Sequence, residues 1–171
     1  MAVNTRGRSY KILANVEITD AQCSGVIFAH GSRFGGHALY IRDKKLVYAY
    51  NFLGIKPEQQ FVSPALKPGK YTFGMAFTRE KRGERGESIG RTQLYVNDRV
   101  VAEGPMRTQP GKFTLSGDGL CIGCDSGDAV SEGYKTPGRF VGGTIQFVGV
   151  TVEKKQYLDL EKLAAGALAV D

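Results

Sequence analysis

Residues 25–54, GVIFAHGSRFGGHALYIRDKKLVYAYNFLG, decide the fold of this chain of 171 residues. They predict three strands in succession, with a Gly-Gly joint at 35–36 and a tight polar turn at 43–44. Residues 26–30 are almost wholly apolar, which is typical of a strand inside a sheet. The stretch contains no set of nucleophile, base and oxyanion donors, and no phosphate-binding loop. We therefore expect it to define architecture rather than catalysis.

Other strands flank this stretch. Residues 10–18 alternate apolar with polar side chains, the period of two that a strand with one buried face shows. The aromatic and Met side chains of residues 71–77 all fall on one parity, which predicts a core-facing strand. Further strands are expected at 37–42, 45–51, 91–96, 99–102, 113–115, 120–124 and 141–152. Loops are expected at 56–60 and 125–139, a hairpin turn at Asn97-Asp98, and a connection punctuated by Pro64 and Pro68.

The element pattern predicts an all-β protein. About ten to twelve strands with hairpin turns and no βαβ rhythm favour an antiparallel β-sandwich of jelly-roll type. We expect residues 1–155 to form this sandwich domain. Leu160, Leu163 and Leu168 recur at helical spacing, so residues 156–171 are expected to form a C-terminal helical tail that packs on or beyond the sandwich.

The net charge of +6 raises the question of nucleic-acid binding. The charges are interleaved, most densely in residues 79–87, REKRGERGE. Alternating signs are typical of a solvated hairpin tip, whereas binding along a phosphate backbone needs one sign over an extended face. We therefore expect no nucleic-acid partner.

Cysteine usage and the N-terminus bear on the compartment. The three cysteines, Cys23, Cys121 and Cys124, cannot all pair within one chain, which favours a reducing environment. Residues 1–12 have no apolar core of a signal peptide, and the longest apolar runs are too short for a membrane span. We expect a cytoplasmic chain with no membrane partner.

Two motifs could hold a metal or carry redox chemistry. Cys121 and Cys124 lie in a predicted strand, which points them to opposite faces instead of placing them at a helix N-terminus. Asp125 and Asp128 offer oxygen ligands on a Gly-bearing loop, but the register of a calcium-binding EF-hand loop is absent. Ordinary Asx turns explain them as well. We expect no cofactor and no metal, with these two aspartates as weak candidates.

His30 and His37 flank the glycine joint, with Arg33 between them, and could supply a base and an anion clamp. No Ser or Cys is placed by motif as their nucleophile, so a buried, hydrogen-bonded His30 is favoured.

The tyrosines of the central stretch could stack on sugar rings. Tyr40, Tyr48 and Tyr50 share a parity with Leu46 and Phe52, which favours core packing or an interface over a sugar platform.

Several phrases of the chain, in order, resemble the C-terminal, non-catalytic part of bacterial arylsulfatase-type enzymes. Residues 25–54 are similar to that family's strand cluster, and residues 90–104 look like its LYV…VAEG hairpin. Residues 124–134 resemble its D.G..VS..Y loop, and 140–145 its F.G.I strand. The resemblance implies a concanavalin A-like, laminin-G-like sandwich behind a sulfatase catalytic domain. None of the three cysteines stands in the formylglycine motif C/S-x-P/A-x-R, so no catalytic residue is carried over.

The resemblance implies a non-catalytic accessory domain that supports the fold, assembly or substrate access of a sulfatase catalytic domain. Loops at one end of the sandwich would present the contact surface, and self-association stays open. The residues expected to contact a partner are Arg33, Phe34, Tyr48, Tyr50 and Tyr134.

Two other function classes stay open. A free-standing carbohydrate-binding, lectin-like module is the main alternative, because this architecture often hosts glycan binding. A glycoside hydrolase would need two suitably spaced carboxylates. Glu17, Asp43, Glu103 and Asp125 are available, but no motif arrays them on one strand face.

Overall fold

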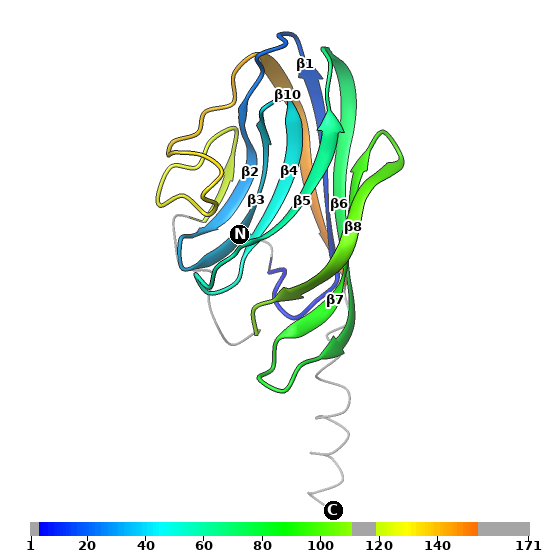
Figure 1. Cartoon of the computed structure of the whole chain (residues 1–171), viewed down its shortest axis with the longest axis vertical. Helices are drawn as coiled ribbons and strands as arrows, with labels where there is room; N and C mark the ends of the chain where they lie inside the picture. Colours follow the sequence, from blue (N-terminus) through cyan, green and yellow to red (C-terminus); the bar gives the residue numbers. More distant parts are fainter. Residues whose placement is uncertain (1–3, 111–118, 154–171) are drawn as a thin grey trace, which may run out of the picture.

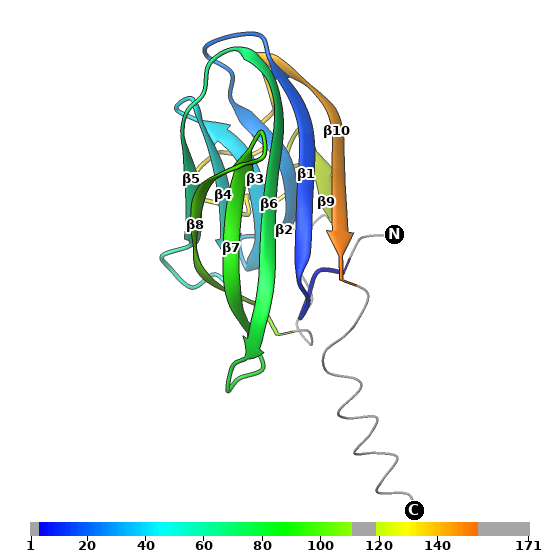
Figure 2. The ribbon, with the colours of Figure 1, turned by 90° about the vertical axis from the view of Figure 1, so that its right-hand side faces the viewer.

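The computed structural model describes residues 4–110 and 119–153, which form two antiparallel five-stranded sheets packed face to face (Figure 1). The front sheet has the order β10-β1-β6-β7-β8, and Figure 2 looks onto its outer face. It contains β1 (Tyr10–Ile18), β6 (Gly69–Arg82), β7 (Ser88–Val96), β8 (Arg99–Thr108) and β10 (Gly143–Val152). The back sheet, in the order β5-β4-β3-β2-β9, contains β2 (Gly25–Ser32), β3 (Gly35–Arg42), β4 (Lys45–Asn51), β5 (Gln59–Ala65) and β9 (Leu120–Ile122). The predicted all-β antiparallel sandwich is confirmed.

Three predictions fall partly or wholly outside these residues. The strand expected at 113–115 and the helical tail expected at 156–171 lie outside the described residues. The domain boundary at residue 155 stays a prediction. Within the described ranges, no helix is long and apolar enough to cross a membrane.

The main core lies between the two sheets. Along β1, Tyr10, Ile12, Ala14, Val16 and Ile18 are all buried, as their alternation with polar residues predicts. They pack against inner-face side chains of both sheets, including Phe28, Leu39, Tyr48, Phe73, Met75, Phe77 and Leu94. Each large side chain buried in this way stabilises the fold by about 1.5–3 kcal/mol.

Two hairpin turns have the conformation that their residues predict. Asp43 and Lys44 between β3 and β4 have φ of 50° and 63°, and Asn97 and Asp98 between β7 and β8 have φ of 47° and 62°. Two-residue hairpin turns that match strand twist need positive φ at both positions, which Asn and Asp tolerate well.

The glycine joint between β2 and β3 is a place of close backbone approach. Gly36 has φ of 150° and faces Gly31 across the hairpin. A Cβ on Gly36 would overlap the carbonyl oxygen of His30 and lie 2.8 Å from the Cα of Gly31. Only glycine fits this position without a shift of the neighbouring strand.

The β3–β4 hairpin places Tyr40 and Tyr48, which are both even-numbered, on opposite faces of the back sheet. Arg42 pairs with Lys45, so Tyr40 faces Val47 and Tyr48 faces Leu39. Paired residues point to the same side of a sheet, and Tyr40 therefore lies on the opposite side from Tyr48. The prediction that Tyr40 shares a face with Tyr48 and Tyr50 is wrong, because parity does not carry across this turn.

Strand β5 occupies residues that were expected as a loop and a connection. The strand runs from Gln59 to Ala65 and includes Pro64, at the edge of the back sheet. Proline is tolerated there because an edge strand has one side without ladder hydrogen bonds. The Gln59 side chain bonds the backbone of Arg107 on β8, donating to its O at 2.8 Å and accepting from its N at 2.8 Å. This bridge closes the sandwich along one side.

A long segment after β9 covers the outer face of the back sheet, beside β2 and β3 in Figure 1. Val26 N bonds Gly138 O at 2.8 Å, and Ser24 forms a bridge with Val141. Under this segment lies a second apolar cluster of Val26, Ala29, Ala38, Tyr40, Val47, Ala49 and Val130. Strands β2, β3 and β4 are therefore buried on both faces, which explains their nearly continuous apolar sequence.

A bulge in β10 redistributes its side chains. Asn15 of β1 pairs with Phe147, and the next residue, Val16, pairs with Ile145, which leaves Gln146 as an extra residue. Ile145 consequently points to the core with Val16, whereas Phe147 lies on the outer face with Asn15.

Candidate functional site

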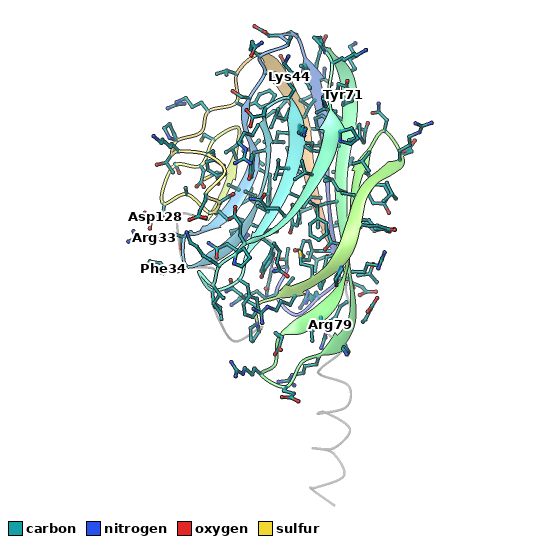
Figure 3. All side chains as sticks on the ribbon, viewed as in Figure 1. Arg33, Phe34, Lys44, Tyr71, Arg79 and Asp128 are labelled. Carbon is teal, nitrogen blue, oxygen red and sulfur yellow. The ribbon has the colours of Figure 1, made fainter. Side chains whose placement is uncertain are left out.

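The tip of the β2–β3 hairpin brings together some of the predicted contact residues. Phe34 is 58% exposed, and the guanidinium carbon of Arg33 lies 4.9 Å from the centre of its ring. Arg33 also forms an ion pair of 3.4 Å with Asp128 of the loop after β9. Figure 3 shows these three residues together at the left-hand side of the molecule. Arg33 and Phe34 are therefore available to a partner.

Tyr134 and Asp125 hold that loop in place. The Tyr134 hydroxyl donates to Asp125 Oδ2 at 2.5 Å, and Val130 N donates to the same oxygen at 3.1 Å. Burial, together with the hydrogen bond to this carboxylate, raises the pKa of Tyr134. Asp125 is itself buried, so its contacts stabilise the loop, and Asp128 is engaged with Arg33. In the part of the chain that the structure describes, no three His, Cys, Asp or Glu side chains form a metal-binding group.

Tyr48 and Tyr50, by contrast, are core residues. Tyr48 is completely buried, and the Tyr50 hydroxyl accepts a hydrogen bond of 2.9 Å from Gln109 N. Burial raises the pKa of both hydroxyls. The prediction that they contact a partner fails, because neither presents a surface. Their inward direction follows from the pairing with β3 described above.

The two histidines face each other across the β2–β3 hairpin without forming a catalytic pair. Their ring centres are 6.0 Å apart, and both are buried. His37 Nδ1 lies 2.9 Å from the Tyr48 hydroxyl, which lies 2.7 Å from the Tyr10 hydroxyl. Burial, with a smaller effect of His30, lowers the pKa of His37 to about 3. Arg33 points to Asp128, so the structure does not assemble a base with an anion clamp.

The cysteines carry free thiols. Strand β9 ends at Ile122, so only Cys121 of the C-x-x-C pair lies in a strand, contrary to the expectation for residues 120–124. Cys121 Sγ lies 3.4 Å from Ser126 Oγ, and Cys23 is buried.

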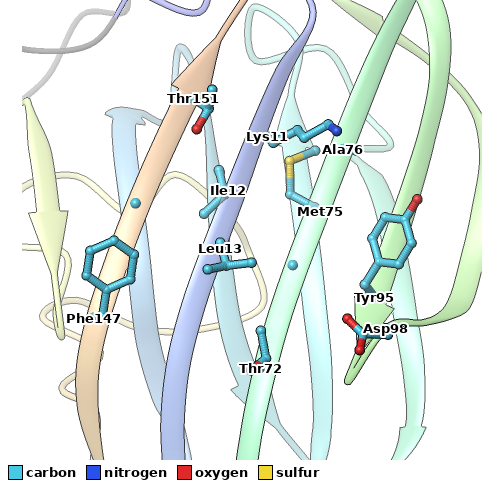
Figure 4. Close-up of a pocket in the computed structure, with 12 residues that line it drawn as sticks. Lys11, Ile12, Leu13, Thr72, Met75, Ala76, Tyr95, Asp98, Phe147 and Thr151 are labelled. Atoms are coloured by element: carbon cyan, nitrogen blue, oxygen red, sulfur yellow. The ribbon is translucent and has the colours of Figure 1, made fainter.

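The outer face of the front sheet carries a groove that none of the sequence predictions identified (Figure 4). Its volume is about 390 Å³, and its floor crosses four strands, from Gly149 on β10 through Leu13 and Gly74 to Tyr95 on β7. Two of these four positions are glycines, so the floor is low between larger side chains. No described segment crosses this face in Figure 2.

Phe147 forms a flat aromatic surface at one end of this groove. A Cβ on Gly149 would lie only 2.8 Å from the ring carbon Cζ of Phe147, which means that the edge of the ring fills the space that a side chain at Gly149 would occupy. The side chain is nevertheless 53% exposed, and its neighbour Leu13 is 45% exposed. Figure 4 shows the ring broadside on the outer face of the sheet, so one ring face is open to solvent.

Polar groups surround these apolar surfaces. Thr72 Oγ1 donates to Asn15 Oδ1 at 3.2 Å, next to Phe147. At the other end, the Tyr95 hydroxyl donates to Gln93 Oε1 at 2.7 Å, and Asp98 lies beside it in the groove. Lys11 also lines the groove and supplies a cation.

The sequence contains a signal for this groove. Apolar residues of 141–152 change parity between Phe147 and Val148, and Leu13 interrupts the polar positions of residues 10–18. An apolar residue on the wrong parity indicates either a bulge or an exposed functional surface.

The chain matches no protein-family model and no curated protein sequence. Its fold is similar to solved structures of low identity. One is the mouse laminin α1 chain, domains LG4-5, with a TM-score of 0.56 and 12% identity. The match covers 86% of the present chain and 37% of the laminin chain. The CBM40 of the Ruminococcus gnavus IT-sialidase has a TM-score of 0.54 and 14% identity over 94% of this chain and 84% of that one. The same CBM40 bound to α2,3-sialyllactose gives a TM-score of 0.55 and 16% identity, over 94% and 83%. The chain therefore has a laminin-G-like, concanavalin A-like sandwich fold.

Proposed function

We propose that this chain is a non-catalytic, lectin-like domain that binds carbohydrate in the groove on the outer face of the front sheet. The observation that carries the proposal is the half-exposed ring of Phe147, which is seen broadside on the outer face of the sheet and fills with its edge the space beside Gly149 (Figure 4). A pyranose ring has an apolar face of C–H groups and a periphery of hydroxyls. It is suited to a flat aromatic surface with hydrogen-bonding groups around it.

The groove provides both kinds of contact in one row. Phe147 and Leu13 offer apolar surface, while Asn15, Thr72 and Asp98 offer side-chain donors and acceptors. From β10 to β7 the floor spans three strand spacings, or about 14 Å. That length favours an extended oligosaccharide over a monosaccharide. The fold supports the same proposal, since a CBM40 bound to sialyllactose is among the similar structures.

Phe147→Ala is expected to weaken glycan binding about tenfold, because the stacking surface is removed. Isothermal titration with oligosaccharides selected on a glycan array measures the effect. The matched control is Phe34→Ala, which removes an aromatic ring of similar exposure, 58% against 53%, at a distant site. Equal binding by wild type and Phe147→Ala, or a wild type that binds no glycan, would contradict the proposal.

A second candidate function rests on the resemblance of residues 25–54 to the C-terminal part of arylsulfatases. The exposed Phe34 and Arg33 lie in this stretch, at the tip of the β2–β3 hairpin. This hairpin belongs to the back sheet, whereas the groove lies on the outer face of the front sheet. In this role the tip would dock onto a sulfatase catalytic domain, and the chain would support its assembly or substrate access. An exposed aromatic beside an arginine is the composition of an interface hot spot.

For this candidate, Phe34→Ala is expected to weaken binding to a separately expressed arylsulfatase catalytic domain by roughly 2 kcal/mol, the scale of a hot-spot residue. Phe147→Ala should leave that binding unchanged, which makes the two variants reciprocal controls. Calorimetry with the purified partner decides the matter. A loss caused by Phe147→Ala, with none from Phe34→Ala, would refute docking through the tip.

A further inference from the structure

We infer that the free edge of β10 is an interface at which two copies of this chain pair, β10 against β10, to form a two-fold dimer. An edge strand offers unpaired backbone N–H and C=O groups to another strand, and proteins that remain monomeric usually protect such edges. The edges of the two sheets differ sharply in this protection.

The side formed by β5 and β8 is closed. The Gln59 side chain occupies both the N and the O of Arg107, and a Cβ on Gly104 of β8 would lie 3.4 Å from the ring of Phe61 on β5. Strand β8 also carries charged residues and a proline, and β5 contains Pro64. Charges and prolines at an edge discourage the addition of another strand.

On the other side of the sandwich, β9 is only three residues long, Leu120–Ile122, and offers little to pair with. Strand β10 has ten residues, GTIQFVGVTV, and contains neither a charged residue nor a proline. Among the described residues, β1 is its only partner in the sheet. It is therefore the longest edge without charge or proline protection.

The core-facing side chains of β10 indicate that this edge is incomplete in one chain. Val148, Val150 and Val152 pack against the main core but stay partly exposed, whereas Ile12 and Ala14 on the neighbouring β1 are completely covered. A strand added beside β10 would cover these valines, as β10 covers β1.

The occupant that fits this edge is a second copy of the same strand. Antiparallel pairing of two identical strands obeys two-fold symmetry, and a neutral strand brings no like-charge repulsion to its own copy. The bulge at Gln146 confines regular pairing to residues 147–152. The two-fold axis is then perpendicular to the sheet that the two front sheets form together. The outer faces of both front sheets, with their grooves, therefore point to the same side.

Sedimentation velocity of the full chain tests the dimer. We expect the wild type to double its mass with increasing concentration, and the variant Gln146→Lys/Thr151→Lys to stay monomeric. Both positions are exposed, so the lysines should leave the fold intact. The charge-matched control is Val62→Lys/Val100→Lys, which places two lysines at exposed positions on β5 and β8 and should dimerise like the wild type.

Two outcomes would overturn the inference. One is a dimer that survives Gln146→Lys/Thr151→Lys or is lost in the control variant. The other is a monomeric wild type, and hydrogen exchange would then show what replaces the dimer. Slow exchange of all the β10 amides in such a monomer would mean that residues 154–171 of the same chain cover the edge instead.

Discussion

Acidification from pH 6.5 to pH 3 is expected to remove about 4 kcal/mol of stability through His37 alone, since its pKa falls from 6.5 to about 3 on folding. The unfolded chain binds a proton on this histidine below pH 6.5, and the folded chain does not. Its contribution is therefore complete above pH 6.5 and is lost progressively as the pH falls toward 3. The main cause is burial of the ring among Tyr10, Tyr48 and Tyr50, with a smaller effect of His30.

Urea unfolding at a series of pH values measures this loss, and His37→Asn provides the comparison. The amide can still reach the Tyr48 hydroxyl but does not titrate, so the difference in slope between the two proteins isolates His37. His30, whose pKa is also lowered by burial and by Arg6, adds a smaller effect of the same sign. If His37→Asn is too unstable to study, NMR titration of the wild type suffices, because the chain has only two histidines. A His37 resonance that titrates near pH 6.5 in the folded state would disprove the effect.

Gly36→Ala is expected to destabilise the protein by about 4 kcal/mol, which combines backbone strain of about 1–3 kcal/mol with overpacking of a similar size. The added methyl would overlap the carbonyl oxygen of His30 on β2, and two hydrogen-bonded strands cannot separate locally to admit it. Chemical denaturation gives the free energy of unfolding.

Gly69→Ala is the matched control for this substitution. Gly69 has φ of 155°, close to the 150° of Gly36, but its Cβ would meet only Tyr71 Cε2, at an ordinary 3.8 Å. The control should lose only the strain, roughly 2 kcal/mol. Equal losses in both variants would show that the close approach of β2 and β3 contributes nothing.

Local features of the sandwich could be predicted from neighbouring residues. The alternation of residues 10–18, the core parity of residues 71–77 and the turns at Asp43-Lys44 and Asn97-Asp98 depend on contacts within a few residues. Strand β5 was missed because its Pro64 is unfavourable in most strands and acceptable only at a sheet edge. Edge position is a property of the whole sheet.

The candidate site depends on the pairing of strands that are far apart in the sequence, which the sequence alone does not reveal. Tyr48 and Tyr50 were expected either in the core or at an interface, because aromatic clusters serve both, and only the pairing of β3 with β4 directs them inward. The outward position of Phe147 could not be predicted from the sequence, because the bulge that turns it outward involves β1, more than a hundred residues earlier in the chain. Arg33 and Phe34 are exposed because a hairpin tip of this kind projects from any sheet.

By itself, the sequence determined that this protein is an antiparallel sandwich and where its two-residue hairpin turns lie. Period-two patterning and turn chemistry act over a few residues, so they can be recognised without a structure. Only the tertiary structure decided which face each aromatic occupies, that the loop after β9 covers the back sheet, and that the front sheet carries a groove and an edge strand, β10, which pairs among the described residues with β1 alone. Those features arise from register between distant strands, where one bulged residue reverses the face of every side chain beyond it.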